Sequence, residues 1–348
     1  MKTKRRSTKA YAKAGVDVDL GNSLKSGIQK IVGETHGPRV LSGVGGFGGL
    51  FRANFPGMKD PVLVSSIDGV GTKLKLAFET GSHGSVGKDL VNHCINDIAV
   101  TGARPLFFLD YLGAGKLEPT VFREILRGFA SACKAADCAL IGGETAQMPG
   151  MYQPGEYDLA GCIVGVVDRK EIWDASRIRA GNVLIGLPSN GLHTNGYSLA
   201  RAVLFEKMSL KLDSKVEGLR GTLGAELLKV HRSYLPELIG PARKLILGAA
   251  HITGGGLLDN LPRVLPENCD ALIDESSWKV PAIFSIIESG GKVPHEEMHQ
   301  VFNMGIGMVL AVKQSDAAAV TKATGGKIIG EVVSGSRKVV IQDSRKKA

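Results

Sequence analysis

Short apolar runs rich in β-branched residues recur along the chain, and most of them lead into a glycine-containing loop. Runs of this kind are typical of buried strands that end in tight turns. The candidate strands are Val62 to Ile67, Leu106 to Leu109, Ala139 to Ile141, Cys162 to Val167, Val183 to Leu187, Met308 to Val312 and Lys338 to Ile341. The glycine clusters lie at 43–49, 69–71, 142–143, 254–256 and 305–307.

Helical spacing predicts four helices, at 90–101, 119–136, 196–206 and 225–249. The second has a proline near its start, which suits the first helical turn. Between 137 and 187 the pattern is strand-rich, with only a short possible helix near Lys170 to Asp174. This order favours an α+β fold over a doubly wound sheet.

A chain of 348 residues suggests two domains. The polar stretch around 168–180 lies between two apolar strands and marks a plausible boundary. We therefore expect a first domain at 14–170 and a second at 171–342. A basic tail at 1–13 is expected to be disordered, and a second basic tail is expected at 343–348.

The net charge of +9 comes from the chain ends. Residues 1–13 and 337–348 together carry +10, which leaves −1 for the body. Nucleic-acid binders concentrate basic charge on a folded face, so this distribution argues against nucleic acid as a partner.

Composition and cysteine usage predict a globular cytoplasmic protein with no membrane partner. The sequence has no apolar run of the length that spans a bilayer, and no apolar stretch follows the basic N-terminus. The five cysteines form no CxxC pair, which indicates buried free thiols in a reducing compartment.

Three acidic residues of the first half stand near glycines or inside an apolar helix. Asp68 opens the segment Asp68-Gly69-Val70-Gly71-Thr72-Lys73, Asp97 lies among apolar neighbours, and Glu144 follows Gly142-Gly143. Carboxylates are ligands that magnesium prefers, and Lys73 can neutralise phosphate. A solvated turn at Asp68 and a buried helix cap at Asp97 are the alternatives.

The segment Gly43-Val44-Gly45-Gly46-Phe47-Gly48-Gly49 formally matches GxGxxG. No long strand precedes it and no clear helix follows, so the dinucleotide interpretation fails. It is either a loop that covers nucleotide phosphates, with Gly45 to Gly49 facing them, or a plain mobile loop.

Two segments of the second half combine glycine with polar side chains. Gly191 to Ser198 contains His193, Thr194, Asn195 and Gly196 and opens a predicted helix. A histidine there is a candidate acid or base, although a structural role is the common alternative. The second segment contains Thr253, Gly254, Gly255 and Gly256, a further candidate phosphate loop.

His295-Glu296-Glu297-Met298-His299 matches the HExxH zinc-hydrolase pattern. Pro294 precedes it and no third ligand follows in the usual extension. Zinc hydrolysis with His295 and His299 is therefore a remote alternative.

Several long segments closely resemble the phosphoribosylformylglycinamidine cyclo-ligase (aminoimidazole ribonucleotide synthetase) family. They are YAKAGVDVDLGN (11–22), IDGVGTKLKLA (67–77), NDIAVTGARPLFFLDYL (96–112), IGGETAQMPGMY (141–152), GLHTNGYSLAR (191–201), HITGGGLLDNLPRVLP (251–266) and FNMGIGMVLAV (302–312). The resemblance spans about residues 11–342. It departs from the family at Gln29, where a lysine linked to ATP is usual and Lys25 and Lys30 are near, and at Gln147 and Thr194.

The resemblance implies a two-domain fold shared with formylglycinamidine ribonucleotide synthetase, selenophosphate synthetase, thiamine-phosphate kinase and a hydrogenase-maturation protein. The N-terminal mixed sheet is expected to pair into a barrel in a homodimer, and the C-terminal domain to be α/β and sandwich-like. Another ATP-dependent kinase or synthetase of this fold is the nearest alternative.

The implied reaction is ATP-dependent ring closure of formylglycinamidine ribonucleotide to aminoimidazole ribonucleotide in purine synthesis, with magnesium. The expected roles are metal binding by Asp68, Asp97 and Glu144; ATP binding by Gly45, Gly46, Phe47, Gly48, Gly49, Asp68, Gly69, Gly71, Thr72 and Lys73; catalysis by His193, Asn195 and Lys73; and substrate or phosphate binding by Thr194, Asn195, Gly196, Thr253, Gly254, Gly255 and Gly256.

Overall fold

The computed structural model describes residues 27–43 and 48–343. The chain divides into two compact units. The first consists of residues 1–57, 65–94 and 105–165, and the second of 58–64, 95–104 and 166–348. The tail at 1–13, residues 344–348 of the other tail, and Gly45, Gly46 and Phe47 lie outside the described residues.

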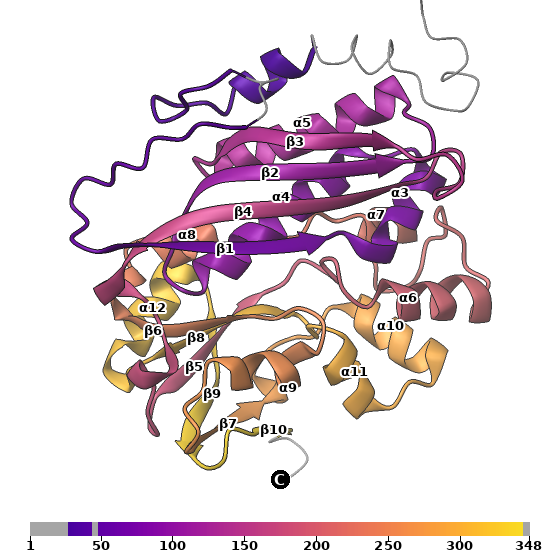
Figure 1. Ribbon diagram of the computed structural model, residues 1–348. Helices are drawn as coiled ribbons and strands as arrows, with labels where there is room; N and C mark the ends of the chain where they lie inside the picture. Colours follow the sequence, from indigo (N-terminus) through magenta and orange to yellow (C-terminus); the bar gives the residue numbers. More distant parts are fainter. Residues whose placement is uncertain (1–26, 44–47, 344–348) are drawn as a thin grey trace, which may run out of the picture. The chain divides into compact units, whose positions relative to one another are not determined.

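The first unit contains a four-stranded sheet that forms a layer in front of its helices in the view of Figure 1. Its strand order is β1-β4-β2-β3, and the strands are β1 (Pro61–Gly69), β2 (Arg104–Ala114), β3 (Ala139–Gln147) and β4 (Tyr157–Asp168). Strands β2 and β3 are parallel, with Tyr111 opposite Glu144. The two edge strands are therefore β1 and β3.

Helices α3 (Leu74–Thr80), α4 (Gly84–Ala99) and α5 (Pro119–Ala135) belong largely to the first unit. Helix α5 buries a stripe at helical spacing that includes Phe122, Leu126 and Phe129. Residues 27–33 are also helical. The apolar spacing predicted α5, and the prediction is confirmed.

Helices α4 and α5 approach closely because glycines lie at their contact. A Cβ atom on Gly87 would lie 2.5 Å from the Ile125 carbonyl oxygen, and one on Gly128 would lie 2.4 Å from that of Gly84. On the sheet, a Cβ on Gly161 would lie 2.2 Å from the Phe108 ring. Larger residues at these positions would force the backbones apart.

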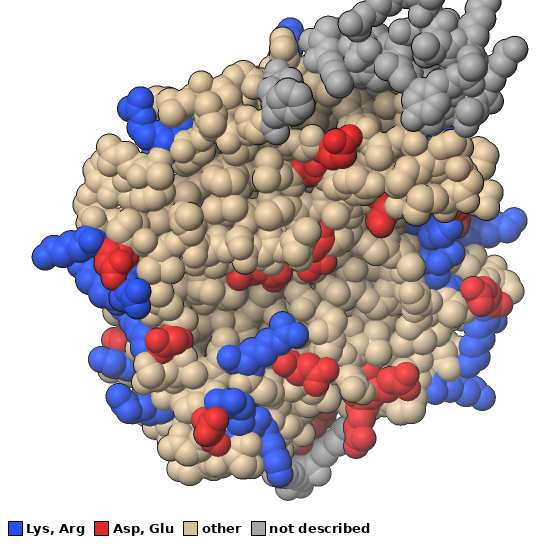
Figure 2. Space-filling view, viewed as in Figure 1, with Lys and Arg blue, Asp and Glu red and all other residues tan. Residues whose placement is uncertain are grey.

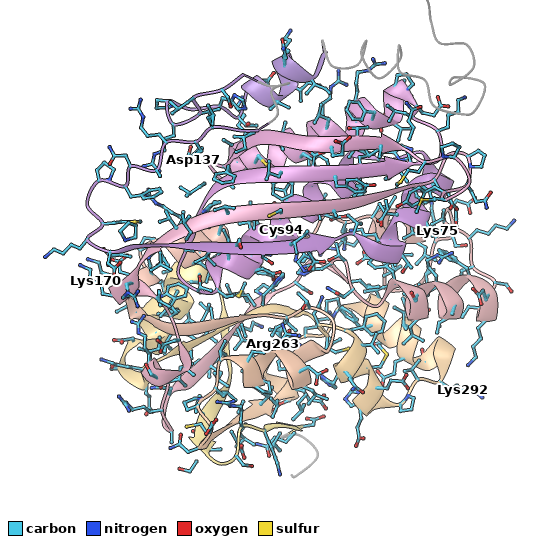
Figure 3. The ribbon with its side chains drawn as sticks, in the orientation of Figure 1. Lys75, Cys94, Asp137, Lys170, Arg263 and Lys292 are labelled. Carbon is cyan, nitrogen blue, oxygen red and sulfur yellow. The ribbon has the colours of Figure 1, made fainter. Side chains whose placement is uncertain are left out.

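Helix α4 also contributes a thiol to this interior. Cys94, labelled in Figure 3, is fully buried and donates to the Gly161 carbonyl at 3.4 Å. Four of the five cysteines are buried, Cys162 is half-buried, and all are free thiols.

The second unit is built on a six-stranded mixed sheet of order β10-β7-β9-β5-β8-β6. The strands are β5 (Val183–Pro188), β6 (Ile246–His251), β7 (Cys269–Asp274), β8 (Ile306–Val312), β9 (Lys327–Ser334) and β10 (Val339–Gln342). Strands β7 and β10 are parallel and the other pairs antiparallel. All residues of β8 are buried, which explains its uninterrupted apolar sequence.

Short helices and turns connect these strands. The α-helices are α6 (Tyr197–Arg201), α7 (Leu223–Leu227), α8 (Leu235–Ile239), α9 (Gly256–Asn260), α10 (Ala282–Gly291), α11 (His295–Val301) and α12 (Ala317–Thr324). A π-helix, η4 (Ala202–Lys207), continues α6. The 3₁₀ turns are η1 (Gly71–Lys73), η2 (Arg169–Glu171), η3 (Ala175–Arg177), η5 (Arg243–Leu245), η6 (Leu261–Arg263), η7 (Glu275–Ser277) and η8 (Gln314–Asp316).

The prediction of one helix over 225–249 is wrong. The chain there forms α7, α8, η5 and the first residues of β6. Pro236 and Pro241 cannot donate a backbone hydrogen bond, and Gly240 ends α8 in extended geometry. The apolar residues after Leu245 instead pair with β8.

Each of the seven strands expected from the sequence overlaps an observed strand, whereas β6, β7 and β9 were not predicted. The short element near Lys170 is the turn η2. Two mixed α/β units agree with the expected combination of helices and sheets. Among the described residues of this one chain, neither sheet closes into a barrel.

An acidic side chain lies within the first sheet, on β2. Burial raises the pKa of Asp110 to about 7, although its own backbone N–H acts in the opposite direction. A Cβ on the neighbouring Gly143 would lie 2.4 Å from Asp110 Oδ1. The folded chain therefore favours the protonated carboxyl, because charge is costly there.

We predict that Asp110→Asn raises thermal stability at pH 8 and much less at pH 5. The folded-state pKa lies above the ordinary value of 3.8, so the stability that the neutral acid contributes is present below about pH 4 and is lost as the pH rises through about 7. Unfolding temperatures measured from pH 4.5 to 8.5 test this, with the exposed Asp213→Asn as control. Parallel curves for the wild type and Asp110→Asn would contradict it.

Candidate functional site

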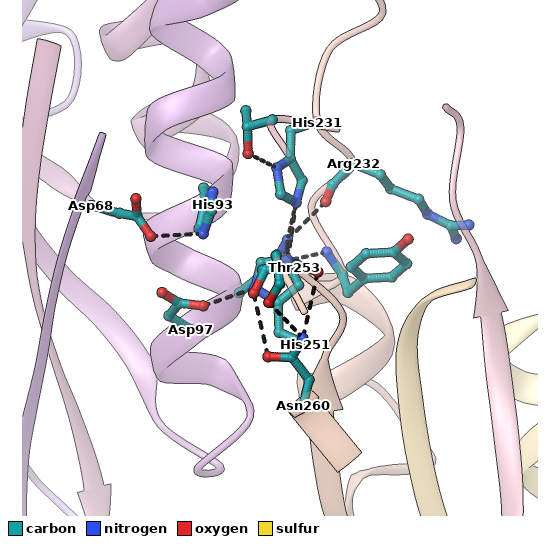
Figure 4. Close-up of polar contacts among 12 residues, drawn as sticks. Asp68, His93, Asp97, His231, Arg232, His251, Thr253 and Asn260 are labelled. Carbon is teal, nitrogen blue, oxygen red and sulfur yellow. Dashed lines mark hydrogen bonds and ion pairs between the residues drawn. The ribbon is translucent and has the colours of Figure 1, made fainter. Parts of the chain in front are cut away.

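Candidate site residues of the first unit lie where β1 ends and turns. Asp68 Oδ2 is 2.8 Å from His93 Nε2, and Asp68 Oδ1 accepts the Gly69 N–H at 2.6 Å (Figure 4). The Asp68 side chain is 38% exposed, while that of His93 is 5% exposed. The buried imidazole thus orients a carboxylate that remains accessible to solvent.

The lysine of the same turn has a buried partner. Lys73 is fully buried, and its Nζ lies 2.8 Å from Asp89 Oδ2, which is also fully buried. Burial lowers the pKa of Lys73, and Asp89 opposes that effect. The structure therefore places Lys73 within an internal ion pair, where sequence analysis had expected a charge that faces phosphate. Gly71, with φ of 67°, begins the turn η1 that contains Thr72.

Glu144 is exposed on β3, the opposite edge strand from β1. Three strand spacings of about 4.8 Å separate these edges by roughly 14 Å. Magnesium binds oxygen at about 2.0–2.1 Å, so Asp68 and Glu144 of one chain do not share one ion in this sheet.

Gly49 lies against the side chain of Ile141 on β3: a Cβ atom added at Gly49 would lie 2.8 Å from Ile141 Cδ1. A Cβ atom added at Gly48 would meet open space.

A cavity of about 230 Å³ in the first unit lies elsewhere. Its walls include Phe78, His83, Lys116 and Tyr157. None of the residues predicted from the sequence lines it, so this cavity does not identify the site.

The second unit contains a chain of polar contacts that begins at Asp97. Asp97 Oδ1 is 2.8 Å from His251 Nδ1, and His251 Nε2 is 3.0 Å from His231 Nε2. His231 Nδ1 is 3.2 Å from Thr194 Oγ1. Figure 4 draws these contacts. Asp97, one of the three acids expected to bind metal, therefore contacts the imidazole ring of His251, and 27% of its side chain is exposed.

Asn96 holds this chain of contacts in place. It is fully buried; its Nδ2 donates to the Arg232 carbonyl at 2.9 Å, and its Oδ1 accepts the Tyr234 N–H at 2.8 Å. The same Nδ2 lies 3.3 Å from His231 Nε2 and 3.4 Å from His251 Nε2. The side-chain amide of Asn96 therefore holds both the backbone next to His231 and the imidazole rings of His231 and His251.

His193 stacks on this network. Its ring is 4.1 Å from that of His231 at 20°, and the residue is 1% exposed with φ of 64°. A Cβ on Gly307 would lie 2.6 Å from His193 Cε1. The fold thus brings together three buried imidazoles, those of His193, His231 and His251, and one nitrogen from each ring lies within 4.8 Å of one nitrogen from each of the others.

The two glycine-rich segments of the second half meet here. A Cβ on Gly254 would lie 3.3 Å from Asn195 Oδ1, although the two residues are far apart in sequence. Asn260 Nδ2 donates to the carbonyls of Gly254 and Gly256 at 3.2 and 2.8 Å, and Thr253 Oγ1 lies 3.4 Å from Asn260 Oδ1. The buried side chain of Asn260 therefore holds the backbone of the loop at 253–256 by hydrogen bonds.

Phe302 contacts both loops. Its ring would lie 2.2 Å from a Cβ on Gly196, and its carbonyl oxygen 2.8 Å from one on Gly256. Gly196 and Gly256 also have positive φ values of 75° and 57°. Both positions require glycine for two independent reasons.

This arrangement can hold anions and move protons. The second-unit loops present glycine backbone beside imidazoles that can exchange protons near neutral pH. The carboxylates of Asp68 and Asp97 are oxygen donors of the kind a hard cation prefers. The sequence motifs did not point to His93, Asp89 or His231, because each of these residues stands outside a glycine-rich segment.

Family comparisons match both units. A family model described as "AIR synthase related protein, N-terminal domain" matches residues 55–167, and one described as "AIR synthase related protein, C-terminal domain" matches 179–343.

Curated relatives agree. A protein of Syntrophotalea carbinolica named phosphoribosylformylglycinamidine cyclo-ligase is 51% identical over 328 residues, covering 92% of this chain and 94% of the relative. Proteins of the same name from Trichlorobacter lovleyi and Bacillus cereus (strain Q1) are 50% and 49% identical, each over 94% of this chain and 95% and 96% of their own. The chain belongs to the phosphoribosylformylglycinamidine cyclo-ligase family.

Solved structures share the fold of this cyclo-ligase family member. Thiamine-monophosphate kinase from Stenotrophomonas maltophilia has a TM-score of 0.66 at 18% identity, with 90% of this chain and 94% of the kinase covered. The hydrogenase maturation protein HypE, solved in complex with ATP, has a TM-score of 0.67 at 16% identity, with 93% and 92% covered. At these identities the likeness shows the fold alone.

We predict that Asn96→Ala destabilises this cyclo-ligase family member, by roughly 1–3 kcal/mol for each buried group left unpaired. The Arg232 carbonyl and the Tyr234 N–H would both lose their partner. Urea unfolding measures the effect. Asn182→Ala, which removes one side-chain acceptor near the surface, is the matched control and should cost much less. Equal losses in the two variants would refute a special role for Asn96.

Proposed function

We propose that this chain catalyses ATP-dependent closure of the imidazole ring of formylglycinamidine ribonucleotide. The products are aminoimidazole ribonucleotide, ADP and phosphate. The observation that carries this proposal is about 50% identity with cyclo-ligases over more than nine tenths of the chain. It is a ligase reaction, because a carbon–nitrogen bond forms as ATP is cleaved.

The chemical difficulty is the formamide oxygen, a poor leaving group. Transfer of the terminal phosphoryl group of ATP to this oxygen gives an iminophosphate. The amidine nitrogen then attacks the same carbon, and the carbon–oxygen bond breaks as phosphate leaves. A protein assists such steps mainly by positioning and by stabilising developing charge.

We assign the proton transfers to the buried imidazoles. Asp97 orients His251, which in turn contacts His231. His193 stacks on His231 and precedes Thr194 and Asn195 on the loop that meets Gly254. In this proposal the loops at 193–196 and 253–256 bind the substrate and its phosphate.

We assign ATP and magnesium to the acidic and glycine-rich segments of the first half, with Asp97. The partly exposed Asp68 and Asp97 carboxylates and the exposed Glu144 fit a hard cation. When bound, magnesium would neutralise phosphate charge. Lys73, paired with Asp89, would hold the turn that carries Gly69, Gly71 and Thr72, and Gly45 to Gly49 would cover the phosphates.

We further propose that the chain acts as a homodimer in which first-unit sheets pair. Asp68 and Glu144 lie on opposite edge strands of one sheet. Pairing of two sheets edge to edge or face to face would allow Glu144 of one copy to serve a site in the other. Sheet pairing also covers exposed β1 residues such as Leu63 and Ile67, which are 63% and 71% exposed.

A nucleic-acid partner is not supported. On the face shown in Figure 2, the acidic and basic side chains of the described residues are interspersed. Within residues 27–43 and 48–343, no helix has the length and apolar content needed to cross a membrane.

The direct test supplies purified protein with formylglycinamidine ribonucleotide, ATP and magnesium. We expect aminoimidazole ribonucleotide and ADP in equal amounts. A kinase or other synthetase of the same fold would release ADP only with a different acceptor. ADP release that does not depend on formylglycinamidine ribonucleotide would reject the proposal.

We predict that His193→Ala lowers kcat by roughly 10²–10⁴-fold, the range for a positioned acid or base. The KM for ATP should change little, because His193 lies outside the segments assigned to ATP. His83→Ala removes another buried imidazole, in the first unit beside Tyr157, and controls for loss of packing. A His193→Ala enzyme with wild-type kcat at saturating substrates would show that His193 is not catalytic.

A further inference from the structure

Two histidines of α11 face a single carboxylate in the second unit. His295 and His299 stand four residues apart, so they share one face of the helix. Their Nε2 atoms lie 2.8 and 2.9 Å from the same atom, Glu275 Oε2. Glu275 comes from η7, 20 residues before His295, which is why the sequence motif alone lacked a third ligand.

We propose that Glu275, His295 and His299 bind one divalent transition-metal ion, with zinc as the favoured metal. The two nitrogens and one carboxylate oxygen lie within 4.8 Å of one another. Zinc binds nitrogen and oxygen at about 2.0–2.2 Å, so a tetrahedral site places its ligand atoms about 3.3–3.5 Å apart. A retreat of Glu275 Oε2 by about 0.5 Å would bring its distances to the two nitrogens, now 2.8 and 2.9 Å, to that spacing.

The contact on the far side of His295 supports this assignment. His295 Nδ1 lies 2.8 Å from Glu288 Oε1 on α10. A carboxylate that accepts the Nδ1 proton leaves the Nε2 lone pair for a metal, and metal-binding histidines commonly have such a partner. Lys292, labelled in Figure 3, marks the turn between α10 and α11.

His299 is the most buried of the three proposed ligands. Its side chain is 4% exposed, against 12% for Glu275 and 45% for His295. Within the described part of the chain, its buried Nδ1 makes no hydrogen bond, so Nε2 is the ring nitrogen through which His299 contacts Glu275. That nitrogen would bind the ion with its lone pair.

The charge around His295 favours a cation. Glu275 and Glu288 each have a carboxylate oxygen 2.8 Å from a ring nitrogen of His295, Glu275 at Nε2 and Glu288 at Nδ1. These two carboxylates would stabilise a bound dication. The His295 side chain is 45% exposed, which leaves a route for entry and space for water as a fourth ligand.

The ligand types select the metal. Imidazole nitrogen suits zinc, cobalt, nickel and copper, whereas magnesium prefers oxygen and usually retains water. The site is therefore chemically distinct from the carboxylates assigned to magnesium. No hydrolytic activity is implied, because the proposal concerns binding alone.

A bound ion would stabilise helix α11, which packs against the loop at 253–256 that we assign to substrate. The His299 carbonyl oxygen lies 1.9 Å from the position of a Cβ on Gly256, and that of Phe302 2.8 Å from it. Helix α11 thus packs directly against the end of the loop at 253–256. An ion that ties η7 to α11 would hold this support in place.

The test titrates metal-free full-length protein with zinc, and in parallel with cobalt, in the presence of excess magnesium. We expect one zinc per chain by elemental analysis after gel filtration, and visible cobalt bands of a site with nitrogen ligands. The variants His295→Gln and Glu275→Gln should each fail to retain this one zinc ion per chain. Glu288→Gln should weaken the Kd roughly 10–100-fold, as for other partners of ligating histidines.

The histidines around His231 are the competing site, so His231→Gln is the matched control and should retain the zinc. Unfolding temperatures without metal establish that each variant is folded; His295 is the least buried of the three ligands, so its variant is the decisive one. The proposal is overturned if the wild type binds no zinc, or if folded His295→Gln retains the ion. Loss of the ion in His231→Gln would then identify the competing site.

Discussion

A single buried amide fixes the geometry of the second-unit site. Asn96 has no solvent to satisfy it, so its donors and acceptor must be met by the Arg232 carbonyl, the Tyr234 N–H and the imidazoles of His231 and His251. A polar network of this kind is stable only when all its members are present. The positions of the imidazoles therefore follow from one residue near the end of α4.

The second constraint on the site is that two loop positions, Gly196 and Gly256, have no room for a side chain. Phe302 occupies space that a Cβ on Gly196 or Gly256 would need. The two loops, distant in sequence, therefore rest on one aromatic residue at the end of α11. This contact links the helix that carries His295 and His299 to the loops assigned to substrate, and it gives the proposed metal site a structural consequence.

The fold alone does not determine which reaction a protein catalyses. Kinase and hydrogenase-maturation structures share it at 16–18% identity, so it serves different chemistries. What separates this chain is near-50% identity with cyclo-ligases along both units. In the first unit, the strand order places Asp68 and Glu144 on opposite edges, and this separation motivates the proposed pairing of two copies.

The sequence by itself determined seven strands, the amphipathic helix α5 and the family, because apolar periodicity and motif segments are local. It failed at 225–249, where an apolar run fits helix or strand until its partner β8 is known. Only the tertiary structure decided that Lys73 is buried against Asp89, that His231 joins His251, and that Glu275 faces His299. These pairs are separated by 16 to 24 residues, and no local pattern encodes a contact that packing alone creates.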